Sequence, residues 1–173
     1  MTTLLTTDRL LIRTWEERDR SALAQMTGDA DMMHYLTEGR VWSADEINEF
    51  YQRQQNHQAR HNICMGLLAR RNDDAAVGVA GLQPLDDGTF ELGWWVWKAH
   101  WGQGFASEAG RALMQHARTV QRLPEVFAVI DPGNLASIRV AEKIGLRYQC
   151  QKPACETVAR RGERMVSIYH MTL

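Results

Sequence analysis

The sequence is poor in several features that mark large classes of protein. It has only 3 cysteines, Cys64, Cys150 and Cys155, too few and too scattered for a disulfide framework. No histidine or further cysteine near the last two completes a zinc quartet, so we expect free thiols and no metal site. The 20 basic residues are balanced by 21 acidic ones, and the net charge of -1 leaves no basic excess for non-specific nucleic-acid binding.

Long apolar runs and targeting signals are also missing. No stretch is long and apolar enough to cross a bilayer, and the N-terminus lacks the basic start and apolar run of a signal peptide. There is no internal repeat, low-complexity tract or Pro/Ser-rich linker. We therefore expect one cytoplasmic domain over residues 1–173, without nucleic-acid or membrane partners. The sequence does not determine the oligomeric state, and it is compatible with a homodimer.

The residues that are present favour a mixed α+β fold, and hydrophobic residues make up 45% of the chain. In the first half, residues 10–13 predict a strand and a helix follows from about Arg18. Ser43 opens a second helix, because Glu46 stands three residues on, at capping-box spacing. Three strands at residues 63–70, 76–85 and 89–96 are separated by short polar turns and predict an antiparallel meander.

The second half changes pattern. Residues 106–122 predict a long helix that Pro124 stops. The nearly all-apolar run 126–130 predicts a strand buried on both faces. A helix at 136–144 with Gly145 as its C-cap follows, and then closing strands at 146–151 and 165–172. The order predicts an antiparallel front, one β-α-β crossover and an antiparallel end.

Gly102 and Gly104 lie between a predicted strand and a predicted helix. Glycines let the backbone approach a ligand closely, and the first N–H groups of a helix have no internal partner. With the positive end of the helix dipole, they form an anion site. The segment is neither G-x-G-x-x-G nor a Walker loop, which disfavours NAD and ATP as ligands. A plain tight turn would use the same glycines.

The neighbouring segments add a resemblance. Residues 91–96 and 101–109 resemble motif A of the GNAT superfamily of N-acetyltransferases, and residues 134–137 and 142–146 resemble its motif B. Residues 10–13 and the pair His34-Tyr35 are similar to the branch that acetylates N-terminal amines of ribosomal proteins. This similarity spans nearly the whole chain in the expected order.

The resemblance implies the GNAT fold: a mixed, mostly antiparallel sheet of about seven strands flanked by about four helices. The fourth and fifth strands, residues 89–96 and 126–130, would be parallel neighbours that splay apart. The implied cosubstrate is acetyl-CoA, with no metal. Its pantetheine would pair with the backbone of the fourth strand, and its pyrophosphate would lie on the glycine loop. The implied cofactor-binding residues are Trp95, Val96, Trp97, Gly102, Gln103, Gly104, Phe105, Ala106, Ser107 and Asn134.

The implied reaction is acyl transfer from the thioester to a primary amine, which must first lose a proton. Glu91 is the first candidate for the general base and Ser137 for a donor to the leaving thiolate, while backbone N–H groups near Val96 would stabilise the oxyanion. Each has a simpler reading: Glu91 as a solvent-facing strand residue, Ser137 as a helix-turn residue and Asn134 as a helix cap. Many family members carry a tyrosine general acid where Ala141 stands, so that role would fall to another group or to water.

The sequence does not identify the acceptor amine. In related enzymes the region from His34 to about Tyr51 forms a lid beside the acceptor pocket. Here its acidic and aromatic side chains, Glu38, Trp42 and Glu46 among them, suit a cationic amine. A protein N-terminus, a polyamine, an aminoglycoside and an amino acid are all compatible. The alternatives are a non-catalytic acyl-CoA sensor with the same fold, which Ala141 favours, and a ribosome-associated protein, which the near-neutral charge disfavours.

Overall fold

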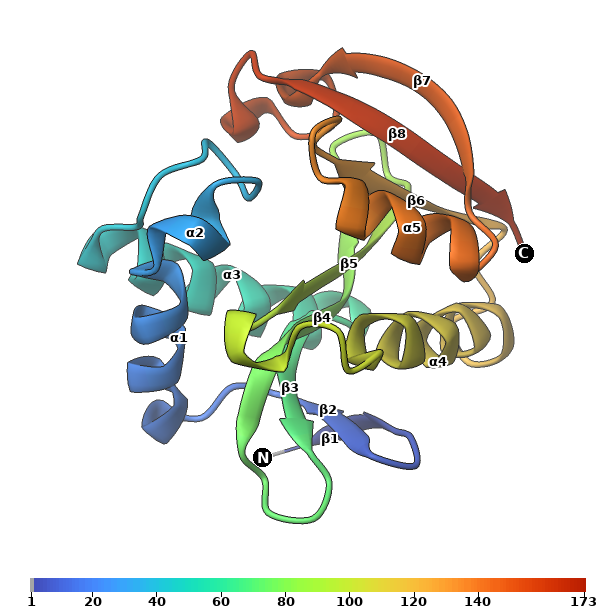
Figure 1. Ribbon diagram of the computed structural model, residues 1–173. Helices are drawn as coiled ribbons and strands as arrows, with labels where there is room; N and C mark the ends of the chain where they lie inside the picture. The colour runs from blue at the N-terminus through green and yellow to red at the C-terminus, as the bar shows by residue number, and fades with distance from the viewer. Residues whose placement is uncertain (1) are drawn as a thin grey trace.

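One sheet organises the chain. The computed structural model describes residues 2–173, and its eight strands run in the order β1-β2-β3-β4-β5-β6-β8-β7 (Figure 1). Within these residues β5 and β6 pair in parallel and every other neighbouring pair is antiparallel. The strands are β1 Thr3–Thr6, β2 Leu10–Arg13, β3 Met65–Arg70, β4 Ala76–Pro84, β5 Phe90–Val96, β6 Glu125–Ile130, β7 Arg147–Pro153 and β8 Met165–Thr172. The mixed sheet is confirmed, with β1 as the strand that the sequence analysis missed.

The helices lie on both faces of this sheet. The α-helices are α1 Arg20–Thr27, α2 Ala30–Met33, α3 Ala44–His61, α4 Phe105–Thr119 and α5 Leu135–Lys143. Short 3-10 segments are η1 Glu17–Asp19, η2 Lys98–His100, η3 Ala154–Glu156 and η4 Ala159–Arg161. In Figure 1, α1 and α2 lie on the left and α3 runs from the left to behind the strands, whereas α4 and α5 lie on the right.

Two helix ends follow from local sequence. The Ser43 side chain accepts a hydrogen bond from the Glu46 backbone N–H at 3.3 Å, and the Glu46 carboxylate accepts from the Ser43 N–H at 2.8 Å. This is the predicted capping box. Gly145 has φ +99° immediately after Ile144, which is the C-cap residue of α5. The predicted glycine stop is therefore present, one residue beyond the cap.

The core is divided by the sheet. The largest cluster lies beneath α4 and α5 and includes Leu92, Trp94 and Leu113. A second cluster, with Phe50 and Leu67, lies beneath α1 to α3. The prediction that β6 is buried on both faces is wrong in part. Alternate residues of β6 enter the main core, whereas Phe127 and Val129 are half-buried against a small cluster of residues from η3 and β8.

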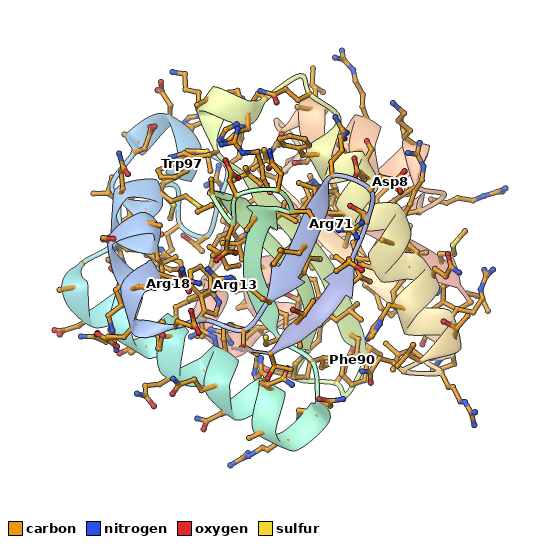
Figure 2. The ribbon with its side chains drawn as sticks, turned by 90° about the horizontal axis from the view of Figure 1, so that it is seen from below. Asp8, Arg13, Arg18, Arg71, Phe90 and Trp97 are labelled. Carbon is orange, nitrogen blue, oxygen red and sulfur yellow. The ribbon has the colours of Figure 1, made fainter. Side chains whose placement is uncertain are left out.

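A buried ion-pair network holds β2 to the first helices. The Arg13 side chain is 1% exposed and binds Asp19 through two hydrogen bonds of 2.7 and 2.9 Å, and it also binds Asp74 at 2.9 Å. Figure 2 labels Arg13 and Arg18, which lie next to each other. Arg18 binds the same Asp74 at 2.7 Å. The Asp19 hydrogen bonds raise the pKa of Arg13, and the Arg13 hydrogen bonds lower the pKa of Asp74. A fully paired charge of this kind is tolerated in a core because each guanidinium N–H finds an acceptor.

His57 on α3 makes stability depend on pH. Burial, and next the charge of Arg53, lowers the pKa of His57 to about 4, and its Nδ1 is buried without a hydrogen-bond partner. The unfolded chain takes up a proton near pH 6.5 and the folded chain does not, so stability present above pH 6.5 falls as the pH drops towards 4.

We expect His57→Gln to remove this part of the pH dependence, worth about 1 kcal/mol after allowance for partial solvent access. The measurement is the free energy of unfolding at pH 7.5 and pH 5. His61→Gln is the control, because His61 lies one turn along α3 and is exposed. Equal pH dependence in all three proteins would contradict the assignment.

Candidate active site

A cleft opens where β5 and β6 separate. Their pairing is limited to Glu91 with Phe127, whereas β4 follows β5 along its whole length from Phe90 to Val96. The cleft beyond that single pair is lined by residues from both strands, the segment after α2 and the start of α5: Tyr35, Leu36, Glu91, Leu92, Gly93, Trp94, Trp95, Ala128, Val129, Ile130, Asp131, Asn134 and Ser137. The predicted splay between the fourth and fifth strands is therefore confirmed.

The hydrogen-bond ladder decides which backbone groups of β5 face the cleft. The Trp97 N–H donates to the Val77 carbonyl at 2.9 Å, and Trp95 stands opposite Val79 in the same register. Because alternate residues of an antiparallel strand bond to the same neighbour, Trp95 directs its N–H and C=O groups towards β4. Trp97 directs its N–H to β4 as well, while its carbonyl accepts the His100 N–H at 2.8 Å. The expectation that these groups are free for a ligand is wrong for Trp95 and Trp97. The groups of Val96, and of Trp94, point to the β6 side.

The glycine loop has the conformation that an anion site needs. Gly102 has φ +75° and Gly104 has φ +80°, a region that only glycine adopts readily. Gly104 is the N-cap residue of α4, and no side chain caps the helix. A Cβ at Gly102 would meet nothing within 4 Å. The first amides of α4 therefore form an open, positively polarised helix end.

Neighbouring side chains fix this loop without covering it. The Trp101 indole N–H donates to the Val96 carbonyl at 2.7 Å, which ties the loop to the end of β5. Glu108 on α4 accepts hydrogen bonds from Thr7 at 2.6 Å and from the Arg9 side chain at 2.6 Å. Arg9 also donates to the Gln103 carbonyl at 3.1 Å. The turn between β1 and β2 thus holds the loop and places a guanidinium beside it.

Glu91 is buried, with 6% of its surface exposed, so its reading as a solvent-facing strand residue is wrong. Its carboxylate accepts a hydrogen bond from Gln83 at 2.7 Å and forms an ion pair with Arg161. Gln83 is its cross-strand partner on β4, while Arg161 comes from η4, far along the chain. A negative charge is thereby held at the wall of the cleft.

The start of α5 forms the other wall. The Asn134 side-chain oxygen accepts from the Ser137 N–H at 3.0 Å, so Asn134 caps α5 as one reading of the sequence proposed. Both residues also line the cleft. Ala141, one turn further on, is fully buried in the main core and carries no hydroxyl group.

Arg164 connects two segments that line the cleft. Arg164 forms an ion pair with Asp131 at 2.6 Å and donates two hydrogen bonds of 3.1 Å to the His34 carbonyl. It therefore links the end of β6 to the segment after α2, which supplies Tyr35 to the cleft. No local sequence pattern predicted this contact.

A second cavity lies beside the cleft, and we call it the lateral cavity. It is lined from α3, β4, β5, η4 and the segment before α3 by Thr37, Glu38, Arg40, Trp42, Glu46, Glu49, Phe50, Arg53, Gln83, Trp95, Arg160 and Arg161. Trp95 lines both spaces, and the Glu91 side chain of the cleft bonds to Gln83 and Arg161 of the lateral cavity. The two spaces therefore adjoin at Glu91 and Trp95.

Comparison with known proteins identifies the architecture. A family model described as an acetyltransferase (GNAT) domain matches residues 9–147. The chain belongs to the GNAT acetyltransferase family. It is 32% identical over 150 residues to the uncharacterized protein YkkB of Bacillus subtilis (strain 168), covering 84% of this chain and 86% of that one. It is 30% identical over 146 residues to the uncharacterized N-acetyltransferase YnaD of the same organism, covering 84% and 83%.

Solved structures agree on the fold. RimL, a ribosomal L7/L12 alpha-N-protein acetyltransferase solved in complex with coenzyme A, superposes with a TM-score of 0.80 over 99% of this chain and 98% of that one, at 20% identity. At this identity the likeness shows the fold alone. It confirms the GNAT architecture that the two sequence motifs implied.

Some of the predicted site residues line the GNAT cleft, and others lie outside its lining. Glu91, Trp95, Asn134 and Ser137 line it together. The loop from Gly102 to Ser107 lies outside that lining, at the exposed end of α4, with Phe105 and Ser107 themselves buried. Sequence reasoning missed Gln83, although the β4–β5 hairpin register could have found it. Arg161 carries no local signal, because it reaches Glu91 only through the tertiary fold.

Other features of this GNAT chain concern metals, membranes and thiols. Within residues 2–173, no group of three or more His, Cys, Asp and Glu side chains is arranged to hold a metal ion. None of the helices in that range is long and apolar enough to span a bilayer. All three cysteines are free, and burial raises the pKa of the Cys64 thiol to about 12.

Proposed function

We propose that this acetyltransferase uses acetyl-CoA as cosubstrate and transfers its acetyl group to the nitrogen of a primary amine by direct attack on the thioester. The observation that carries the proposal is the uncapped amino end of α4, tied to the cleft strand β5 by the hydrogen bond between Trp101 and Val96. This arrangement suits a ligand with a diphosphate at one end and a reactive group at the other.

Several residues would hold acetyl-CoA. The backbone amides from Gln103 to Ser107 would bind the pyrophosphate, with the Arg9 guanidinium beside them. The Val96 N–H, and that of Trp94, would pair with the pantetheine amides as an added strand does. Asn134 would support the same arm from α5 while it caps the helix. No metal enters this scheme, because the amino end of α4 supplies the positive potential.

The chemistry falls to groups around the cleft. Acetyl-CoA supplies the activated acyl group as a thioester. Glu91 would accept the ammonium proton of the acceptor, directly or through water, since only the neutral amine has a lone pair for attack. The amine nitrogen then bonds to the carbonyl carbon and the bond from that carbon to sulfur breaks. A backbone N–H near Val96 that pantetheine leaves free would stabilise the developing oxyanion, and the remaining extra proton of the nitrogen would pass through Ser137 or water to the leaving thiolate.

A thiol-release assay tests the proposal. The protein is incubated with acetyl-CoA and a panel of peptides, polyamines, aminoglycosides and amino acids, and free thiol is measured. We expect at least one class of amine to raise the rate well above the rate without amine, with an N-acetylated product in the mass spectrum. Tight acetyl-CoA binding by calorimetry without thiol release over the whole panel would instead indicate an acyl-CoA sensor, which the absence of a hydroxyl at Ala141 favours.

A further inference from the structure

The lateral cavity contains more positive charge than its internal ion pairs use. Arg53 on α3 and Arg160 and Arg161 on η4 all line it. Arg161 is paired with Glu91. The Arg53 Nε is buried without any hydrogen-bond partner, and the Arg53 guanidinium lies over the Phe50 ring at 5.5 Å. A buried guanidinium N–H without an acceptor is costly, because it has lost water and gained nothing in return.

The like charges also act on each other. Burial, and next the charges of Arg160 and Arg161, lowers the pKa of Arg53 to about 10. Arg53 therefore remains a cation at neutral pH although its surroundings oppose the charge. Repulsion of this kind is relieved by an anion that lies between the guanidiniums and accepts their hydrogen bonds.

The acidic side chains of the cavity do not provide that anion. Glu46 binds Arg40 at 2.7 Å, and Glu38 binds the same guanidinium at 3.1 Å. Glu49 also lines the cavity, and its charge favours the Arg53 cation from one turn earlier on α3, but within residues 2–173 no ion pair joins the two side chains. Glu38 and Glu46, which suggested a cationic acceptor from the sequence, thus both pair with Arg40, and within residues 2–173 neither forms an ion pair with Arg53.

We propose that the lateral cavity binds an acceptor amine that also carries an anionic group, a carboxylate or a phosphate, and that Arg53 and Arg160 hold this group. The inference rests on the proposed function. The anion would lie against α3 and η4, so the amine of the same molecule reaches Glu91 and Trp95, where the lateral cavity meets the cleft. Neighbouring guanidiniums also favour the neutral form of an amine, which is the form that attacks.

Matched substrate pairs test the proposal. One pair is an α-amino acid and its carboxamide, and the other is phosphoethanolamine and ethanolamine, so each pair differs in the anionic group and the two pairs separate carboxylate from phosphate. We expect the anionic member of at least one pair to have a kcat/KM about tenfold or more above its neutral counterpart. Arg53→Gln and Arg160→Gln should each raise the KM of that substrate about tenfold and leave the KM of acetyl-CoA unchanged.

Arg60→Gln is the control, because Arg60 is exposed on α3 and does not line the cavity. Arg160→Gln serves if Arg53→Gln unfolds, since Arg160 is exposed. Neutral members that react as well as anionic ones, or a preference that survives both variants, would overturn the proposal.

A binding measurement separates this inference from the transferase reaction. Trp42 and Trp95 line the lateral cavity, so tryptophan fluorescence reports on its occupancy. Titration with inorganic phosphate should give a saturable change in the wild type and in Arg60→Gln, weakened about tenfold in Arg53→Gln. That result without thiol release would refute the transferase and keep the anion site. No saturable change in the wild type would refute the anion site whatever the enzymatic activity.

Discussion

Gly104→Glu is expected to lower the affinity for acetyl-CoA by about 100-fold or more while the protein stays folded. The substitution places a carboxylate at the amino end of α4, where the amides would bind the pyrophosphate. It repels the diphosphate and can itself accept the hydrogen bonds of those amides, as an N-cap side chain does. Loss of two charge-assisted hydrogen bonds at about 1.5 to 3 kcal/mol each corresponds to this range.

The conformation of Gly104 requires a matched control. Its φ of +80° makes any other residue strained by about 1 to 2 kcal/mol, although an added Cβ would lie 3.7 Å from Arg9 and would not clash. Gly88→Glu introduces the same side chain at φ +84° in the β4–β5 turn, with nothing within 4 Å of its Cβ. We expect similar losses of thermal stability in both variants but weaker acetyl-CoA binding, by calorimetry, only in Gly104→Glu. Unchanged affinity in Gly104→Glu would refute the proposed diphosphate site.

Local sequence signals predicted the elements that local physics determines. The capping box at Ser43 and the strand Met165–Thr172 were found because their hydrogen bonds and periodicity involve residues close together in sequence. Strand β1 was missed because it is a short edge strand without buried residues that mark one face. Strand β8 lies between β6 and β7 in the sheet. This order could not be predicted, because the alternation of side chains along a strand does not determine which strands pair.

The features of the candidate site also differ in whether the sequence could predict them. The glycine loop was found because a strand, two glycines and a helix start are adjacent in the chain. The prediction of free backbone groups failed for Trp95 and Trp97. Which residues of β5 bond to β4 depends on the register between the two strands and not on composition. The lateral cavity was not predicted at all. Arg53 and Arg160 belong to separate segments, and only the tertiary fold brings their charges together.

Glu91→Gln is expected to lower kcat/KM about 100-fold at pH 7, with a difference from the wild type that shrinks as the pH approaches the pKa of the acceptor amine. The reason is that the amide cannot accept the ammonium proton, whereas at high pH the solvent removes it without help. The measurement is the pH–rate profile of both proteins with one amine. Parallel profiles over the whole range would show that Glu91 is not the base.

A variant of Arg161, the ion-pair partner of Glu91, distinguishes a structural role of Glu91 from a catalytic one. Removing either member of the Glu91–Arg161 pair leaves a largely buried charge or dipole without its partner, so both Glu91→Gln and Arg161→Gln should lower the thermal stability. Only Glu91→Gln removes the proton acceptor. Arg161→Gln should therefore keep the shape of the wild-type pH–rate profile but displace it along the pH axis, because the base has lost a neighbouring cation. If the two variants changed that profile alike, the ion pair as a whole would position the cleft, and proton removal would have to be assigned to water.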